Sequence, residues 1–176
     1  MGYKWNWGIF FQLSPDGTYT YLQLLLFGAG WTLATALLAW AIALSVGTLV
    51  GVIRTAPVPW LVRLGNAYVE LFRNIPLLVL VLLVYFALPA TGIRLDKYES
   101  FIGSLALYAG AYLTEVFRAG LLSVPKGIVE AGRAIGLTRM QTNLSVVMPV
   151  MLRNSLPSLG NTFIGMFKDS SLVSII

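Results

Sequence analysis

Long apolar runs alternate with short polar segments along this chain of 176 residues. Residues 17–53 contain no charged side chain, and residues 74–93 contain none either. A helix that crosses the apolar core of a bilayer needs about 20 such residues. We therefore predict transmembrane helices over 27–53 and over 74–93, the second entered from about Asn66.

Two further helices are predicted, and both contain polar residues. The third covers residues 100–124, although Glu115 and Arg118 lie inside it. Their spacing of three residues places them on one helix face, where pairing offsets a burial cost of about 2.5–3.5 kcal/mol per charge. The fourth helix is predicted over 152–167, or on to 176. The expected fold class is an all-α membrane protein, a polytopic helical bundle of about four spans.

Two polar segments flank the first predicted helix. Residues 1–21 are rich in aromatic side chains, which are favoured where membrane meets water. We expect an interfacial lead-in there, with a turn at residues 14–17, where proline and glycine occur together. Residues 54–73 are predicted to be a loop, because Pro57 and Pro59 end the preceding helix.

The polar segment 125–149 is predicted to form two short helices that meet at Gly136. Pro125 suits a first helical turn, and Gly136 can supply the left-handed residue that ends a helix. Thr138 and Gln141 are three residues apart, which fits a capping box at the start of the second helix. The segment is equally consistent with an ordinary polar loop between two spans.

Composition and charge distribution agree with a membrane protein. Hydrophobic residues make up 57% of the chain and charged residues 11%, against about a quarter in soluble domains. Basic residues outnumber acidic ones by three to one in 54–73 and by five to two in 115–153. The positive-inside rule places these two loops in the cytoplasm and the amino terminus outside. It also explains the net charge of +5 without nucleic acid, so we expect membrane lipid and no nucleic acid as a partner.

Catalytic chemistry has few candidate residues in this sequence. Cysteine and histidine are both absent, which removes the commonest zinc ligands and the usual nucleophile–base pairs. No G-x-x-x-x-G-K-[ST] phosphate-binding loop occurs. We therefore expect a protein that is not an enzyme and needs no metal or cofactor, with any ATPase on another chain.

One part of the polar segment resembles a known motif. Glu130-Ala131-Gly132, followed by Gly136 and later Pro149, is similar to the EAA loop of the permease subunits of bacterial ABC importers. The resemblance implies that 125–149 is a cytoplasmic coupling loop in a single permease domain over 1–176, docking on a dimer of ATP-binding subunits. The contact residues implied are Glu130, Ala131, Gly132, Arg133 and Gly136.

Three further segments resemble the polar amino-acid group of these permeases. They are 68–77 (YVELFRNIPL), 110–120 (GAYLTEVFRAG) and 156–172, which contains LPSLGN and KDSSL. The amino-terminal WNWGIF and residues 69–76 look closest to glutamate and aspartate permeases. The resemblance implies a bacterial inner-membrane location, a second permease subunit (identical or different), a periplasmic or lipid-anchored binding protein, and a polar L-amino acid as solute.

Five residues are candidates for the solute pathway: Asn74, Pro76, Glu115, Asn161 and Lys168. Lys168 would meet a solute carboxylate, and a helix opened at Asn74 and Pro76 would offer free N–H groups. The structural alternative is that the charges only pair with one another. In that case Glu70 pairs with Arg73, and Glu115 with Arg118.

Two other functions remain open at this stage. The solute could be another polar compound, such as glutamine, arginine, histidine or cystine. Alternatively, the chain is a membrane subunit that binds the ATPase and transports nothing. Because members of the family run past this point with at least one further span, we expect that carboxy-terminal spans are missing.

Overall fold

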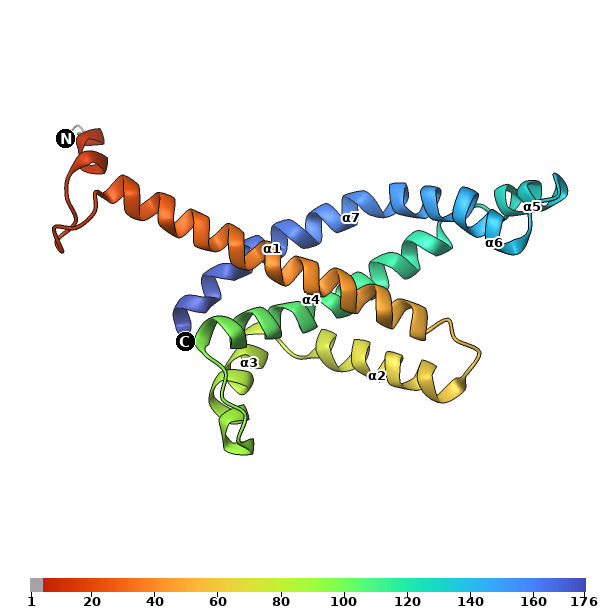
Figure 1. Ribbon diagram of the computed structural model, residues 1–176, viewed down its shortest axis with the longest axis horizontal. Coiled ribbons are helices and arrows are strands. Elements are labelled where there is room, and N and C mark those ends of the chain that lie inside the picture. The colour runs from red at the N-terminus through yellow and green to blue at the C-terminus, as the bar shows by residue number, and fades with distance from the viewer. Residues whose placement is uncertain (1–4) are drawn as a thin grey trace.

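Three long helices run along the length of the molecule, cross one another and form its body (Figure 1). The computed structural model describes residues 5–176, so the first four residues of the predicted lead-in lie outside the described residues. The body consists of α1 (Tyr21–Ile53), α4 (Lys97–Leu122) and α7 (Met148–Asp169). Around it lie α2 (Pro59–Asn74), α3 (Leu77–Leu82), α5 (Lys126–Ala134) and α6 (Arg139–Thr142).

The helix α1 begins six residues before the predicted start at residue 27. Thr20 and Gln23 form a capping box, in which the Thr20 N–H donates to Gln23 Oε1 over 2.9 Å. The predicted turn before it is confirmed: the Gly17 N–H donates to the Ser14 carbonyl over 2.8 Å. Gly17 takes a left-handed φ of 68°, which glycine adopts without steric cost.

Small residues on one face of α1 let α4 approach closely. Ala36, Ala39 and Ala43 are fully buried. At Gly47, an added Cβ would lie 2.8 Å from the Cβ of Leu113 on α4. Helices in lipid gain little from apolar burial against each other, so this close packing supplies much of their attraction. The core continues along α4 through Phe101, Leu105 and Ala109. It extends to Leu77 and Val81 on α3 and to Met166 on α7.

The prediction of a loop over 54–73 is wrong, because α2 occupies most of this range. Pro59 stands at its first position, where the missing N–H costs nothing. Gly65 and Val69, four residues apart, are buried, whereas Arg63 and Glu70 are exposed. The prolines that end α1 therefore open a new amphipathic helix rather than an irregular segment.

The predicted second span is also not one straight helix. The axis bends by 102° between α2 and residues 77–91. Pro76 disfavours helical backbone at the residue before it, and Ile75 is accordingly extended, with φ −93° and ψ 124°. Beyond α3, a π-helical turn at Leu83–Ala87 and a 3-10 turn at Leu88–Thr91 complete the segment.

Within residues 5–176, α1 and α4 are long and apolar enough to cross a membrane, and the bent pair counts as a third span if taken together. The predicted fourth span corresponds to α7, which starts four residues before residue 152 and continues as a 3-10 helix over Ser170–Ile175. Its 22 residues suffice in length, but Asn154, Asn161 and Lys168 make it more polar than α1. The all-helical bundle predicted for the chain is confirmed.

Candidate functional site

A polar cavity of about 490 Å³ lies between α2 and α4, close to the end of α1. Five of its side chains are charged, and they come from α2, from α4 and from the residue that caps the end of α1. Burying these charges in so apolar a bundle costs free energy, so charged residues there usually pair with one another or serve a function. The lining residues are Arg54, Asn66, Val69, Glu70, Arg73, Asn74, Tyr112, Glu115 and Arg118.

Glu115 lies at the centre of the paired charges. Arg54 donates from Nη1 to Glu115 Oε1 over 2.6 Å, and Arg118 donates from Nε to Glu115 Oε2 over 2.9 Å. Arg54 caps α1 and also donates from Nε to Asn66 Oδ1 over 2.7 Å. The cluster of Arg54, Glu115 and Arg118, which we call the charge triad, therefore joins the end of α1 to α4 and, through Asn66, to α2.

Arg73 and Glu70 do not form the predicted ion pair. The Arg73 guanidinium lies 5.3 Å from the centre of the Tyr112 ring, a cation–π geometry that links α2 to α4. Asn74 donates from Nδ2 to the backbone carbonyl of Glu70 over 2.8 Å at the last turn of α2. Within residues 5–176 the Glu70 carboxylate has no ion pair, although it lines the cavity.

The structure brings together only part of the predicted solute pathway. Asn74 and Glu115 line the cavity, whereas Pro76, Asn161 and Lys168 do not. Pro76 stands at the amino-terminal end of α3, outside the cavity lining. Asn161 and Lys168 are exposed on α7, the latter in its last turn.

Three polar residues of the cavity were not among the site residues predicted from the sequence: Arg54, Asn66 and Tyr112. Arg54 is the first charge after the long apolar run and marks the end of the helix. Its partner Glu115 lies 61 positions away, a separation that no local pattern specifies. Tyr112 could have been found from its spacing, because it lies one helical turn after Tyr108 and so on the same face. The Tyr108 hydroxyl donates to the Tyr112 hydroxyl over 3.2 Å.

The segment that follows α4 forms a second candidate site. The two predicted short helices are present as α5 and α6, and they meet at Gly136, whose φ is 89°. The capping box predicted for Thr138 and Gln141 is confirmed, with the Thr138 N–H donating to Gln141 Oε1 over 2.9 Å. Pro125 precedes α5 as its cap instead of lying in the first turn.

The predicted contact residues of this segment are mostly available to a partner. Glu130, Ala131, Arg133 and Gly136 are exposed. Gly132 is buried, and a Cβ there would lie 3.3 Å from the Thr142 methyl group. Gly132 therefore allows α5 to pack closely on α6, and the exposed residues lie on this packed pair of helices.

The segment is held to the bundle by the close contact of α4 and α7. At Gly120 on α4, an added Cβ would collide with the hydroxyl of Ser155 on α7. Nearby, Asn154 donates from Nδ2 to Ser123 Oγ over 2.8 Å. These contacts fix the two helices that enter and leave the 125–147 segment.

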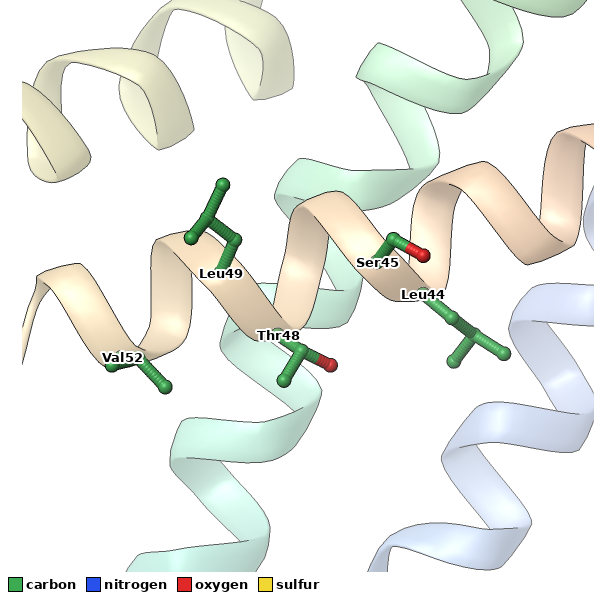
Figure 2. A pocket seen from close by; sticks show the side chains of 5 residues that line it. All are labelled: Leu44, Ser45, Thr48, Leu49 and Val52. Carbon is green, nitrogen blue, oxygen red and sulfur yellow. The ribbon is translucent and has the colours of Figure 1, made fainter.

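A shallow depression on α1 has no chemistry of its own. Figure 2 shows its lining side chains, all of which belong to one helix: Leu44, Ser45, Thr48, Leu49 and Val52. The Ser45 hydroxyl already donates to the Ala41 carbonyl over 3.0 Å. With the Ser45 hydroxyl satisfied within the helix and three of the five lining residues apolar, this face is suited to lipid or to another helix.

Comparison with known proteins gives a consistent result. Residues 43–176 match the family described as binding-protein-dependent transport system inner membrane component. The chain is 39% identical over 148 residues to the "Probable glutamine ABC transporter permease protein GlnM" of Bacillus subtilis (strain 168), covering 82% of this chain and 67% of the relative. It is 36% identical over 189 residues to the "Glutamate/aspartate import permease protein GltJ" of Escherichia coli (strain K12), covering 100% of this chain and 77% of the relative.

The fold of the chain is also similar to that of a solved amino-acid transporter. A crystal structure of an amino acid ABC transporter with histidines superimposes with a TM-score of 0.83 and 33% identity. The match covers 88% of this chain and 72% of the solved one.

Proposed function

The chain belongs to the family of binding-protein-dependent transport system inner membrane components, and we propose that it carries a polar L-amino acid, with glutamate and aspartate favoured. As a family member it is a multi-pass inner-membrane permease of an amino-acid ABC transporter, and a transport protein rather than a catalytic enzyme. Such permeases associate with an ATP-binding subunit and a substrate-binding protein. The observation that carries the solute proposal is the charged cavity between α2 and α4.

The cytoplasmic side of the molecule is proposed to be the end that bears α5 and α6. The connection between α1 and α2 lies at this same end, and the amino terminus lies at the other (Figure 1). These segments contain the basic residues Arg54, Lys126, Arg133 and Arg139, with Glu130 as the acid among them, and Arg63 lies near the start of α2. The positive-inside rule then orients the amino terminus outward, with residues 5–21 as an outward-facing interfacial lead-in.

The segment 125–149 is proposed as the coupling loop, with Glu130, Ala131, Arg133 and Gly136 meeting the ATP-binding subunit. Movement of that subunit would reach the bundle through α4 and α7, which the Gly120–Ser155 contact holds together. The partner permease subunit is either a second copy of this chain or a different chain.

Gly136→Ala tests the docking role. The left-handed φ of 89° costs a residue with a Cβ about 1–2 kcal/mol, although the space around it is open. We expect the hinge between α5 and α6 to shift and co-purification of the ATP-binding subunit to fall by about fivefold. The matched control is Gly127→Ala, which is exposed in the same segment, has open space and lies in a helix. Equal recovery of the ATP-binding subunit with both variants would contradict the assignment.

Solute passage is proposed to use the polar cavity, with Arg73 and Asn74 offering donors to a carboxylate. Glu115 then acts on the pathway by holding Arg54 and Arg118 in place. A separate part of the solute route is proposed to contain Asn161 and Lys168 on α7 and Pro76 between α2 and α3. In this arrangement Glu70 and the charge triad set the electrostatic balance of the cavity.

Competition for uptake tests the solute class. The chain is co-expressed with its ATP-binding and substrate-binding partners in a strain that lacks its own glutamate uptake, and entry of labelled L-glutamate is measured. Unlabelled glutamate or aspartate should suppress entry more strongly than glutamine, arginine, histidine or cystine. Stronger suppression by glutamine would move the assignment to that solute. Recruitment of the ATP-binding subunit without any uptake would support a subunit that transports nothing.

A further inference from the structure

A second cavity, of about 430 Å³, lies between α1, α4 and α7. Figure 1 shows α1 and α7 separating toward the end that bears α5 and α6. Arg54, Asn66 and Arg118 line both this cavity and the polar one, so they form the partition between the two. The remaining walls are mostly apolar and include Val52, Phe117, Leu121, Met148, Met151 and Leu152.

The partition gives this apolar cavity a cationic end. The charge triad contains two positive groups and one negative group, so it carries a net charge of +1. Within residues 5–176, Arg118 uses only Nε, and 59% of its side chain is exposed. Its remaining N–H groups are therefore available to an anion.

The position of the triad fits the headgroup level of a membrane. Arg54 is the first charge after the charge-free run of residues 17–53 and caps the helix that this run forms. A basic pocket between helices at this depth is suited to an anionic headgroup, and apolar walls are suited to a hydrocarbon chain.

We propose that this cavity binds one anionic phospholipid, with its phosphate on Arg118 beside Arg54 and an acyl chain along the apolar walls. A zwitterionic amino acid would leave those walls unmatched, because they offer it few polar partners. Gly51 of α1 lies in the wall, and a Cβ there would meet nothing within 4 Å, so the cavity has room at this point.

Lipid retention by the purified transporter complex tests the proposal. The complex is reconstituted with equal amounts of phosphatidylglycerol and phosphatidylcholine, extracted in mild detergent, and its bound lipid is measured by mass spectrometry. We expect phosphatidylglycerol to be retained about fivefold over phosphatidylcholine, and Arg118→Gln to remove this preference. Because Arg118→Gln also alters the triad, Gly51→Leu provides a second variant that fills the cavity and should lower retention of both lipids. Gly30→Leu, at another open glycine of α1, is the matched control and should retain lipid as the unaltered chain does.

Several results would overturn the proposal. Equal retention of the two lipids would show that the cationic end does not select the headgroup. Unchanged retention in Gly51→Leu would show that the lipid does not bind in this cavity. Displacement of phosphatidylglycerol by glycerol phosphate alone would point to a soluble phosphate ligand, and displacement by L-glutamate would point to a solute site. Full cross-linking of Leu152→Cys to the second permease subunit would show that protein covers the cavity.

Discussion

Glu115→Gln is expected to lower the free energy of unfolding by about 2 kcal/mol, because it leaves two arginines facing each other without their shared anion. Arg54 and Glu115 are mostly buried, with 18% and 22% of their side chains exposed, so water screens the repulsion only in part. Titration of the purified complex with sodium dodecyl sulfate, followed by circular dichroism, measures the change.

Glu70→Gln is the matched control for this experiment. It makes the same chemical change in the same cavity, but Glu70 has no ion pair within residues 5–176. Its effect on unfolding should be below about 0.5 kcal/mol, as for most exposed substitutions. Equal losses from the two variants would show that the triad does not join the helices as described.

Gly120→Ala is expected to destabilise the bundle by about 2 kcal/mol, the usual range for a methyl group forced into a filled space. The added Cβ would collide with Ser155 Oγ and would lie 3.2 Å from the Met151 carbonyl. The helices α4 and α7 would have to separate just where they enter the coupling segment. We therefore expect both the unfolding midpoint and the ATP-dependent uptake rate to fall.

Ser155→Ala should rescue Gly120→Ala, because it removes the colliding oxygen. Alone it should cost little, since Ser155 Oγ only donates to the Met151 carbonyl of its own helix, over 2.8 Å. Gly103→Ala, at an open position of α4, is the matched control and should be neutral or slightly stabilising. Additive losses in the double variant would argue against direct contact at this point.

Charge-free length was a sufficient guide to α1, because lipid demands long apolar helices with internal hydrogen bonds. It was not sufficient for residues 74–93, where the chain breaks at Pro76, and α4 was predicted although Glu115 and Arg118 lie inside it. The capping pair Thr138–Gln141 and the left-handed Gly136 were also predictable, since both depend on residues close in the sequence.

The helix α2 was not predicted; its residues were assigned to a loop. The loop was predicted from the charges and prolines of residues 54–73. The helix instead depends on an amphipathic pattern in which Arg63 and Glu70 lie on the exposed face. The charge triad was only half visible: Glu115 and Arg118 are neighbours on one helix, but Arg54 reaches them through the packing of α1 on α4. Such tertiary pairings depend on how helices cross, which a single sequence does not encode locally.

The length of α1 has a consequence for the lipids in which the protein can reside. Its 33 residues measure about 50 Å, whereas a hydrocarbon core is about 30 Å thick. Trp31 stacks on Tyr98 of α4 with ring centres 5.4 Å apart, and 23 residues, or about 35 Å, separate Trp31 from Arg54. Together the ring pair and the arginine bracket a slab that matches one thickness of bilayer, and in shorter-chain lipids the helix would have to tilt or draw its neighbours inward.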